Sequence, residues 1–123
     1  MEMGELYDSI RPRYPEFQGK VALVTGSSLG IGQGIAMRLA REGMQVIIHG
    51  KEAHEVAATV DALQARGASA RGITADFGTP DGVDRLFDAV RERCDSLYLL
   101  VNNAADLRRT HFQDASVALL DHQ

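Results

Sequence analysis

The stretch Val24 to Ala36, VTGSSLGIGQGIA, constrains this chain most, because three of its four glycines are spaced G-x-x-x-G-x-G between two regular apolar patterns. The apolar run from Val21 to Val24 predicts a buried strand. Apolar residues then recur at helical spacing from Ile35 to Ala40, which predicts a helix directly after the glycines. A glycine turn between a strand and a helix lets a pyrophosphate approach the backbone, and the free N–H groups of the helix start attract its charge. The stretch therefore predicts a dinucleotide-binding turn, and it lacks the Gly-Lys-Ser/Thr ending of a nucleotide-triphosphate loop.

The rest of the chain continues the same alternation. Apolar runs predict further strands at residues 46–48, 71–76 and 97–101, and apolar stripes predict helices at residues 53–63 and 83–90. Gly43 and Gly67 are expected to end the first two helices, and Thr79 and Pro80 to begin the third. The order of elements predicts an α/β fold with parallel strands and right-handed crossovers.

Composition excludes several classes of protein. The 123 residues suit one domain, and a formal charge of -4 argues against a nucleic-acid binder, which needs a basic face. A single cysteine, Cys94, allows no internal disulfide and fits a reducing, cytoplasmic compartment. The start of the chain is unlike a signal peptide, and no apolar run is long enough to cross a membrane, so no membrane association is expected.

Two regions are expected along the chain. Residues 1–18 hold two of the three prolines and predict a leader, either a flexible terminus, which we favour, or an arm across the surface. Residues 19–123 are expected to form a dinucleotide-binding domain.

Three motifs carry a family resemblance. The pattern T-G-x-x-x-G-x-G at Thr25 to Gly32 resembles that of the short-chain dehydrogenase/reductase family. The pair Asp76-Phe77 is similar to the family's adenine contact, and residues 101–105, VNNAA, are similar to its N-N-A-G element, with alanine in place of the final glycine. The resemblance covers nearly everything from Phe17 onwards and implies a Rossmann-like parallel sheet with helices on both faces and strand order 3-2-1-4-5-6-7.

The resemblance also implies a cofactor site. Residues of the glycine turn would hold the pyrophosphate, the end of the second strand the adenosine ribose, Asp76 and Phe77 the adenine, and the Asn-Asn element the nicotinamide ribose. The candidate cofactor-binding residues are Gly26, Ser28, Leu29, Gly30, Ile31, Gly32, His49, Gly50, Lys51, Asp76, Phe77, Asn103 and Ala104. For His49, a surface histidine without a role is the alternative.

The second strand ends without the carboxylate that holds a ribose 2′-OH in NAD-dependent folds. Lys51 stands there instead and is placed to pair with a 2′-phosphate, which favours NADP and leaves NAD open. Two features weaken this preference. Glu52 lies next to Lys51, and Leu29 replaces a basic residue that many NADP-dependent members carry.

No catalytic residue is assigned. The family uses a tyrosine, a lysine four residues later and a serine for hydride transfer between the nicotinamide and a carbonyl or alcohol. Arg11, Gln18 and Asn102 stand four residues after the three tyrosines, so none of them fits, and Ser116 comes too early. We expect a Rossmann-like fold truncated after the fourth strand, which binds cofactor and is inactive alone.

An exposed fourth strand would present unpaired N–H and C=O groups that can pair with a strand of another chain. The alternative function is therefore a non-catalytic interaction module, or a truncated fragment, that self-associates through the edge at Leu97–Val101. Of the remaining candidates, the four histidines lack metal-site spacing, Cys94 is interpreted as structural, and Arg108-Arg109 as a solvated loop.

Overall fold

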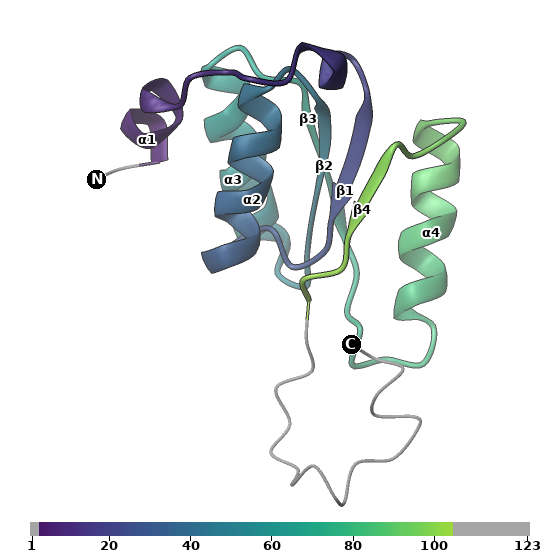
Figure 1. The fold of residues 1–123 in the computed structure, drawn as a ribbon. Helices are drawn as coiled ribbons and strands as arrows, with labels where there is room; N and C mark the ends of the chain where they lie inside the picture. Colours follow the sequence, from purple (N-terminus) through teal and green to yellow (C-terminus); the bar gives the residue numbers. More distant parts are fainter. Residues whose placement is uncertain (1–2, 105–123) are drawn as a thin grey trace, which may run out of the picture.

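The structure is a computed structural model that describes residues 3–104. Strands and helices alternate in it as the sequence predicts, after short helical segments near the N-terminus (Figure 1). The elements in chain order are α1 (Met3–Ser9), the 3-10 turn η1 (Pro15–Phe17), β1 (Val21–Val24), α2 (Gly30–Arg41), β2 (Gln45–Gly50), α3 (Ala53–Ala65), β3 (Ala70–Thr74), α4 (Gly82–Arg93) and β4 (Leu99–Val101).

The four described strands form one sheet in the order β3-β2-β1-β4, and every neighbouring pair is parallel. Helices α2 and α3 cover one face of the sheet, and α4 covers the other (Figure 1). The Rossmann-like arrangement, with helices on both faces, is confirmed. So is the strand order that the family resemblance implies for the first four strands.

The apolar runs of the sequence follow from burial on both faces of this sheet. In β1, Ala22 and Val24 pack toward α2 and α3, while Leu23 between them packs toward α4. In β2, Ile48 packs toward α2 and α3, and Ile47 packs toward α4. Successive strand residues point to opposite faces, so a strand with helices on both sides needs apolar residues at every position.

Helix α2 ends where the sequence predicts, in a Schellman motif. Gly43 takes a φ of 93°, and its N–H donates to the carbonyl of Ala40. The N–H of Met44 donates to the carbonyl of Leu39, which completes the motif. The end of α3 at Gly67 repeats this pattern.

The predicted start of α4 is wrong. The helix begins at Gly82, three residues after Thr79, because Thr79 belongs to a turn that precedes it. The Thr79 hydroxyl donates to the carbonyl of Asp76 at 2.8 Å, and the N–H of Gly82 donates to the carbonyl of Thr79. The threonine therefore caps a turn rather than the helix.

Strand β4 is shorter than the run that predicts it. Its first residue is Leu99, although the N–H of Tyr98 already donates to the carbonyl of Val21 at 2.9 Å. Leu100 is 47% exposed and Tyr98 is 53% exposed. Self-association through this strand stays a prediction.

The N-terminal segment forms an arm over α2 and α3, and α1 within it was not predicted. Tyr7 is buried against this side of the molecule, with the Arg41 guanidinium over its ring. Asp8 forms an ion pair with Arg66 at the end of α3. This placement corresponds to the surface arm rather than to the flexible terminus that we favoured, while the domain boundary at residue 18 stays a prediction.

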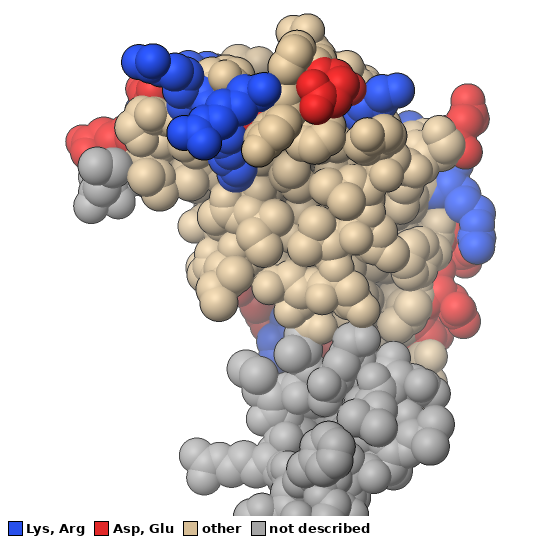
Figure 2. Space-filling model, in the orientation of Figure 1, with Lys and Arg blue, Asp and Glu red and all other residues tan. Residues whose placement is uncertain are grey.

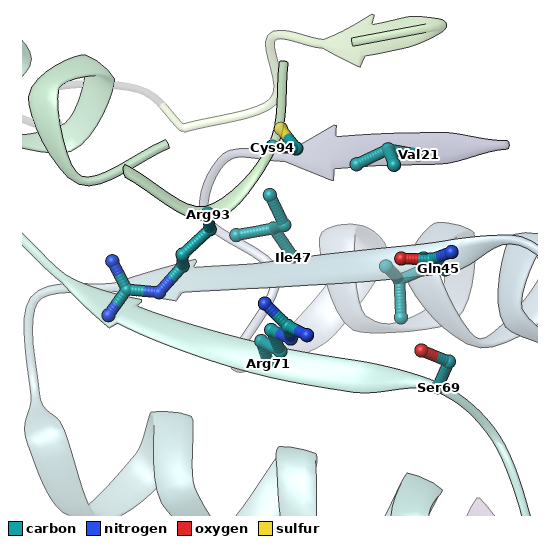
Figure 3. A pocket seen from close by; sticks show the side chains of 8 residues that line it. Val21, Gln45, Ile47, Ser69, Arg71, Arg93 and Cys94 are labelled. Atoms are coloured by element: carbon teal, nitrogen blue, oxygen red, sulfur yellow. The ribbon is translucent and has the colours of Figure 1, made fainter. Parts of the chain in front are cut away.

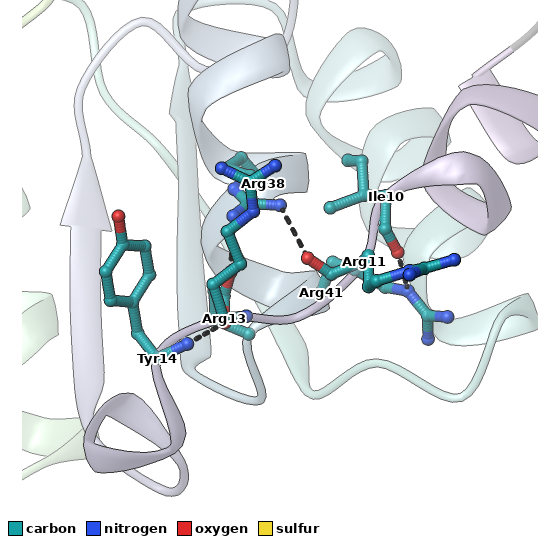
Figure 4. A network of polar contacts seen from close by, with 7 residues as sticks. Ile10, Arg11, Arg13, Tyr14, Arg38 and Arg41 are labelled. Carbon is teal, nitrogen blue, oxygen red and sulfur yellow. Dashed lines mark hydrogen bonds and ion pairs between the residues drawn. The ribbon is translucent and has the colours of Figure 1, made fainter.

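Glu42 anchors the middle of the arm. Its carboxylate accepts the N–H groups of Arg13 and Tyr14 at 2.7 and 2.8 Å, and its second oxygen lies 2.7 Å from the guanidinium of Arg38. Arg38 and Arg41 also donate to carbonyls of the arm (Figure 4). Figure 2 shows that basic side chains gather over this end of the molecule. Burial of Glu42 raises its pKa, but the two N–H donors and Arg38 outweigh burial and hold the pKa below its ordinary value of 4.5.

We expect Glu42→Gln to lower the melting temperature and to release the arm, because an amide offers the two N–H donors a weaker acceptor and loses the pair with Arg38. Thermal unfolding and amide exchange at Arg13 and Tyr14 measure this. The exposed neighbour Glu16, changed to Gln, serves as the control and should leave both unchanged.

The difference between wild type and Glu42→Gln should depend on pH. A carboxyl whose folded pKa is lowered stabilises the protein fully above its unfolded pKa of about 4.5 and loses this contribution as the pH falls through the folded value. A difference in melting temperature that stays constant down to strongly acidic pH would show that the carboxylate does not anchor the arm.

Candidate functional site

The carboxyl ends of the four parallel strands border a cleft of about 490 Å³. Its walls come from the loop after β1, the end of β2 with the start of α3, the loop after β3, and the residues after β4. Ten of the predicted cofactor-binding residues line it, namely Gly26, Ser28, Leu29, His49, Gly50, Lys51, Asp76, Phe77, Asn103 and Ala104. In open α/β sheets this end is where ligands bind.

The other three predicted residues, Gly30, Ile31 and Gly32, form the first turn of α2 and are not among the cleft's lining residues. Three lining residues were not predicted: Glu55, Ala75 and Gly78. Ala75 and Gly78 flank the predicted pair Asp76-Phe77, so the motif itself was the available signal. Glu55 lies in the first turn of α3, where nothing in the sequence distinguished it from Glu52.

Two glycines of the turn have no room for a side chain. Gly26 takes a φ of 63°, and a Cβ on it would lie 3.0 Å from the Cα of Ala104. A Cβ on Gly32 would run into the carbonyl oxygen of Gly26, and it would lie 2.5 Å from the amide nitrogen of Asn103. The glycine turn predicted between the strand and the helix is therefore present, and the backbone approaches itself closely there.

Helix α2 begins beside this turn without a side-chain cap. Its N-cap is Leu29, which has extended backbone and no side-chain oxygen to accept the first N–H groups. The side chains of Leu29 and Ile31 are exposed. The uncapped helix start gives this end of the cleft a partial positive charge, which suits an anionic ligand.

His49 is buried, which corrects the surface alternative. Only 3% of it is exposed, because it lies between the turn after β1 and the loop after β3. Its Nδ1 accepts the N–H of Gly26 at 2.9 Å, and its Nε2 lies 2.9 Å from the carbonyl oxygen of Ala75. The ring of Phe77 stacks on it at a centroid distance of 4.5 Å. His49 borders the cleft, but both of its ring nitrogens already have partners in the protein.

The partners of His49 define its protonation state. A carbonyl oxygen can only accept, so Nε2 carries the proton that is shared with Ala75, and Nδ1 is the bare acceptor for Gly26. Burial lowers the pKa of His49 below its ordinary value of 6.5, and the hydrogen bond to Ala75 opposes this only in part. The ring is therefore neutral at pH 7.

Thr25 ties the other side of the turn to the residues after β4. Its buried hydroxyl oxygen accepts the N–H groups of Asn103 and Ala104 at 2.9 and 3.0 Å. The side-chain amide of Asn103 donates to the carbonyl of Gly26 at 3.2 Å. Sequence reasoning used Thr25 only as part of the motif, and this clamp was missed.

The two serines of the turn have different roles. Ser27 is fully buried, and its hydroxyl accepts the backbone N–H of His49 at 2.9 Å. Ser28 lines the cleft beside Gly50, where a Cβ on the glycine would run into the Ser28 hydroxyl. Only Ser28 is therefore placed to face a ligand.

Among the described residues, three charged side chains border the cleft. Lys51 is exposed at the end of β2, and within residues 3–104 no hydrogen bond or ion pair engages its ammonium group. Glu55 follows on α3. Asp76 is partly engaged, because one of its oxygens accepts the N–H of Gly78 at 2.8 Å.

The three tyrosines lie away from this cleft. Tyr98 contacts Phe17 and Lys20 where β1 and β4 begin, Tyr14 also packs on Phe17, and Tyr7 belongs to α1. They therefore lie at the opposite end of the sheet or on the arm.

A small hollow of about 10 Å³ also lies far from the cleft, beside the starts of β1 and β2 (Figure 3). Arg71, Arg93 and Cys94 border it, and its volume suffices for about one water molecule.

Within residues 3–104, no cluster of three or more potential metal ligands occurs and no helix is long and apolar enough to span a membrane. Several candidates fall outside these residues: Ala105 of the Asn-Asn element, Arg108-Arg109, His111, Ser116 and His122.

Comparisons with known proteins agree with this geometry. The family model for short chain dehydrogenases matches residues 20–122. The chain belongs to the short-chain dehydrogenase family. Among solved members, RhlG of Pseudomonas aeruginosa in a complex with NADP is 35% identical, with a TM-score of 0.72 over 92% of this chain and 43% of its own. A short-chain dehydrogenase of Burkholderia cenocepacia in complex with NADP is 40% identical, with a TM-score of 0.69 over 86% of this chain and 44% of its own.

Relatives in sequence are also oxidoreductases by name. The uncharacterized oxidoreductase YvaG of Bacillus subtilis is 47% identical over 88 residues, which are 70% of this chain and 32% of that protein. The 3-oxoacyl-acyl-carrier-protein reductase FabG of Aquifex aeolicus is 35% identical over 107 residues, or 86% of this chain and 42% of that protein. The matched part of the chain thus spans 32–44% of the length of these short-chain dehydrogenases.

The two helical glycines Gly32 and Gly34 offer a matched test of the close approach. We expect Gly32→Ala to destabilise the fold by roughly 1–3 kcal/mol, because its Cβ needs the space of the Gly26 carbonyl. Gly34→Ala meets no atom within 4 Å and should stabilise by about 0.5–1 kcal/mol through helix propensity. Urea unfolding of both variants measures this, and equal effects would contradict the described packing.

Proposed function

We propose that this chain binds NADP in the cleft at the carboxyl ends of its strands, as the dinucleotide-binding part of an oxidoreductase. The observation that carries the proposal is the glycine turn. At Gly26 and Gly32 the backbone excludes any side chain, and beside them an uncapped helix begins. An anion has room there and meets unpaired N–H donors.

The turn would hold the pyrophosphate. Backbone N–H groups at Gly30, Ile31 and Gly32 are the donors that the first turn of α2 leaves without intrahelical partners. Ser28 would add its hydroxyl from the cleft wall. The N–H of Gly26 is already bound to His49, so Gly26 serves by its conformation rather than as a donor.

The far wall would hold the adenosine. Gly50 and the loop with Asp76 and Phe77 border this part of the cleft, and Lys51 lies beside it. An ammonium group without an ion pair among residues 3–104 suits a 2′-phosphate, and no carboxylate ends β2 to repel one. The solved relatives that are NADP complexes support the same choice. NAD remains the alternative cofactor, since Glu55 borders the cleft as well.

The residues after β4 would face the nicotinamide ribose. Asn103 and Ala104 border the cleft next to the glycine turn, held there by Thr25. When bound, the cofactor supplies hydride transfer, for the family with a carbonyl or an alcohol. We assign no catalytic group among the described residues.

Activity, substrate and partners of the whole protein are also proposals. The names of the relatives include reductases and dehydrogenases of several substrates, which supports an oxidoreductase and no one substrate class. A cytoplasmic location is proposed on the sequence, whose single cysteine forms no internal disulfide.

Fluorescence titration with NADPH and with NADH tests the cofactor. We expect saturable binding with NADPH the tighter ligand. Lys51→Gln should weaken NADPH binding roughly three- to tenfold, as for an exposed charge on a phosphate, and leave NADH binding unchanged.

Lys20→Gln, which changes the chain's other lysine at the far end of the sheet, is the control and should alter neither affinity. Equal loss of NADPH and NADH affinity in Lys51→Gln would refute the assignment to the 2′-phosphate. Absence of binding of either nucleotide to the wild type would refute the proposed function.

A further inference from the structure

The most deeply placed ionisable side chain beside the cleft is His49, and the proposed cofactor contacts make no use of its ring. The residue makes four hydrogen bonds that converge on the turn and the loop around it. Its backbone N–H and carbonyl pair with the hydroxyl and N–H of Ser27, at 2.9 and 2.7 Å. Its ring joins Gly26 to Ala75. We call the two ring hydrogen bonds the His49 bridge.

The His49 bridge connects segments that are distant in sequence and meet only in this fold. Gly26 lies 23 residues before His49, and Ala75 lies 26 residues after it. One end of the bridge holds the turn expected to carry the pyrophosphate, and the other holds the strand end that precedes Asp76 and Phe77. The ring therefore sets the distance between the two walls of the cleft.

The Gly26 end of the bridge tolerates only a neutral ring. A protonated imidazole carries hydrogen on both nitrogens, so Nδ1 would present a donor to the N–H of Gly26. Two donors facing one another repel, and the partly buried N–H of Gly26 would lose its acceptor. The Ala75 end keeps its donor in either state. Protonation therefore breaks the bridge at the glycine turn.

Within the part of the chain that the structure describes, charged groups near His49 come from three segments. Asp76 lies on the loop after β3, Lys51 directly follows β2, and Glu55 lies on α3, all bordering the same cleft. The turn after β1 presents the uncharged N–H of Gly26 to the ring, and the loop after β3 presents the ring of Phe77. Burial dominates the lowered pKa of His49, with only the hydrogen bond to Ala75 opposing it.

We propose that His49 is a proton-sensitive positioning residue, whose neutral ring holds the glycine turn in its binding conformation and whose protonation weakens dinucleotide binding. This inference rests on the proposed function, since it concerns the affinity of that same cleft. It adds a regulatory property, namely that binding falls as the pH drops below neutral.

The direction with pH follows from linkage. The pKa of His49 is below 6.5 in the folded protein and about 6.5 in the unfolded chain. At a pH between the folded and the unfolded pKa, the unfolded chain therefore binds more protons. The stabilisation by the neutral ring is complete above about pH 6.5 and is lost as the pH falls toward the folded pKa. Acidic pH therefore opposes both the fold and the binding turn.

The test measures NADP⁺ affinity by calorimetry between pH 5 and pH 8 in wild type, His49→Asn and His54→Asn. An asparagine places its carbonyl oxygen near the position of Nδ1 and accepts the Gly26 N–H at every pH. We expect wild-type affinity to fall roughly tenfold more than that of His49→Asn over this range, as for one lost hydrogen bond. His54 is exposed on α3, so its variant should follow the wild type. Because all three proteins bind the same ligand, titration of its 2′-phosphate cancels in the comparison.

A second measurement does not need a folded variant. Nitrogen NMR of the wild type should show His49 as the neutral Nε2–H form at pH 7.5. Exchange protection of the Gly26 amide should disappear as His49 titrates.

His49→Gln, which can reach Ala75 but leaves Gly26 without an acceptor, should bind NADP⁺ weakly at every pH.

Three results would overturn the inference. The first is that the affinities of wild type and His49→Asn change in parallel with pH. The second is that wild-type affinity rises on acidification, because the cation attracts the pyrophosphate directly. The third is that Nδ1 carries the proton at pH 7.5. A wild type that binds no nucleotide at any pH would instead refute the proposed function, and the Gly26 amide would then decide alone whether the bridge responds to protons.

Discussion

The structure depends on how the turn after β1 is held between the strands on either side of it. From β2, His49 accepts the N–H of Gly26 and pairs through its backbone with Ser27. From the β4 side, the residues after the strand donate to Thr25 and to the Gly26 carbonyl. Parallel strands end at a common edge, so one short turn reaches both neighbours. The cleft exists because this turn is tied down at both ends.

Stability and ligand binding therefore make demands on the same few atoms. Gly26 and Gly32 bring backbone so close to backbone that any side chain would displace the turn. The N–H of Gly26 is partly buried, and leaving it without an acceptor would destabilise the turn. A buried histidine that gives Gly26 an acceptor and Ala75 a donor satisfies two loops with one ring. It does so only in one protonation state.

The opposite end of the sheet has a different chemistry. There the arm is fastened by Glu42, which gathers two backbone N–H groups and a guanidinium in a site with almost no solvent exposure. A carboxylate suits this site because all its partners are hydrogen-bond donors. His49, in contrast, must accept a hydrogen bond from Gly26 and donate one to Ala75. The two ends thus respond to different pH ranges, since the ordinary pKa is 4.5 for the Glu42 carboxyl and 6.5 for the His49 imidazole.

Local patterns in the sequence determined the alternation of strands and helices, the glycine turn, and the helix end at Gly43, because each depends on neighbours within a few residues. The same motifs indicated most of the residues that border the cleft, since the carboxyl ends of parallel strands converge. Tertiary structure alone decided the role of His49, the clamp of Thr25, the start of α4 and the packing of the arm. Each of these rests on partners that are remote in sequence or on a hydrogen bond that competes with a local propensity. From the sequence, a histidine near the end of a strand gives no sign of whether it faces solvent or joins two loops. Only the fold brings Gly26 and Ala75 to its two ring nitrogens.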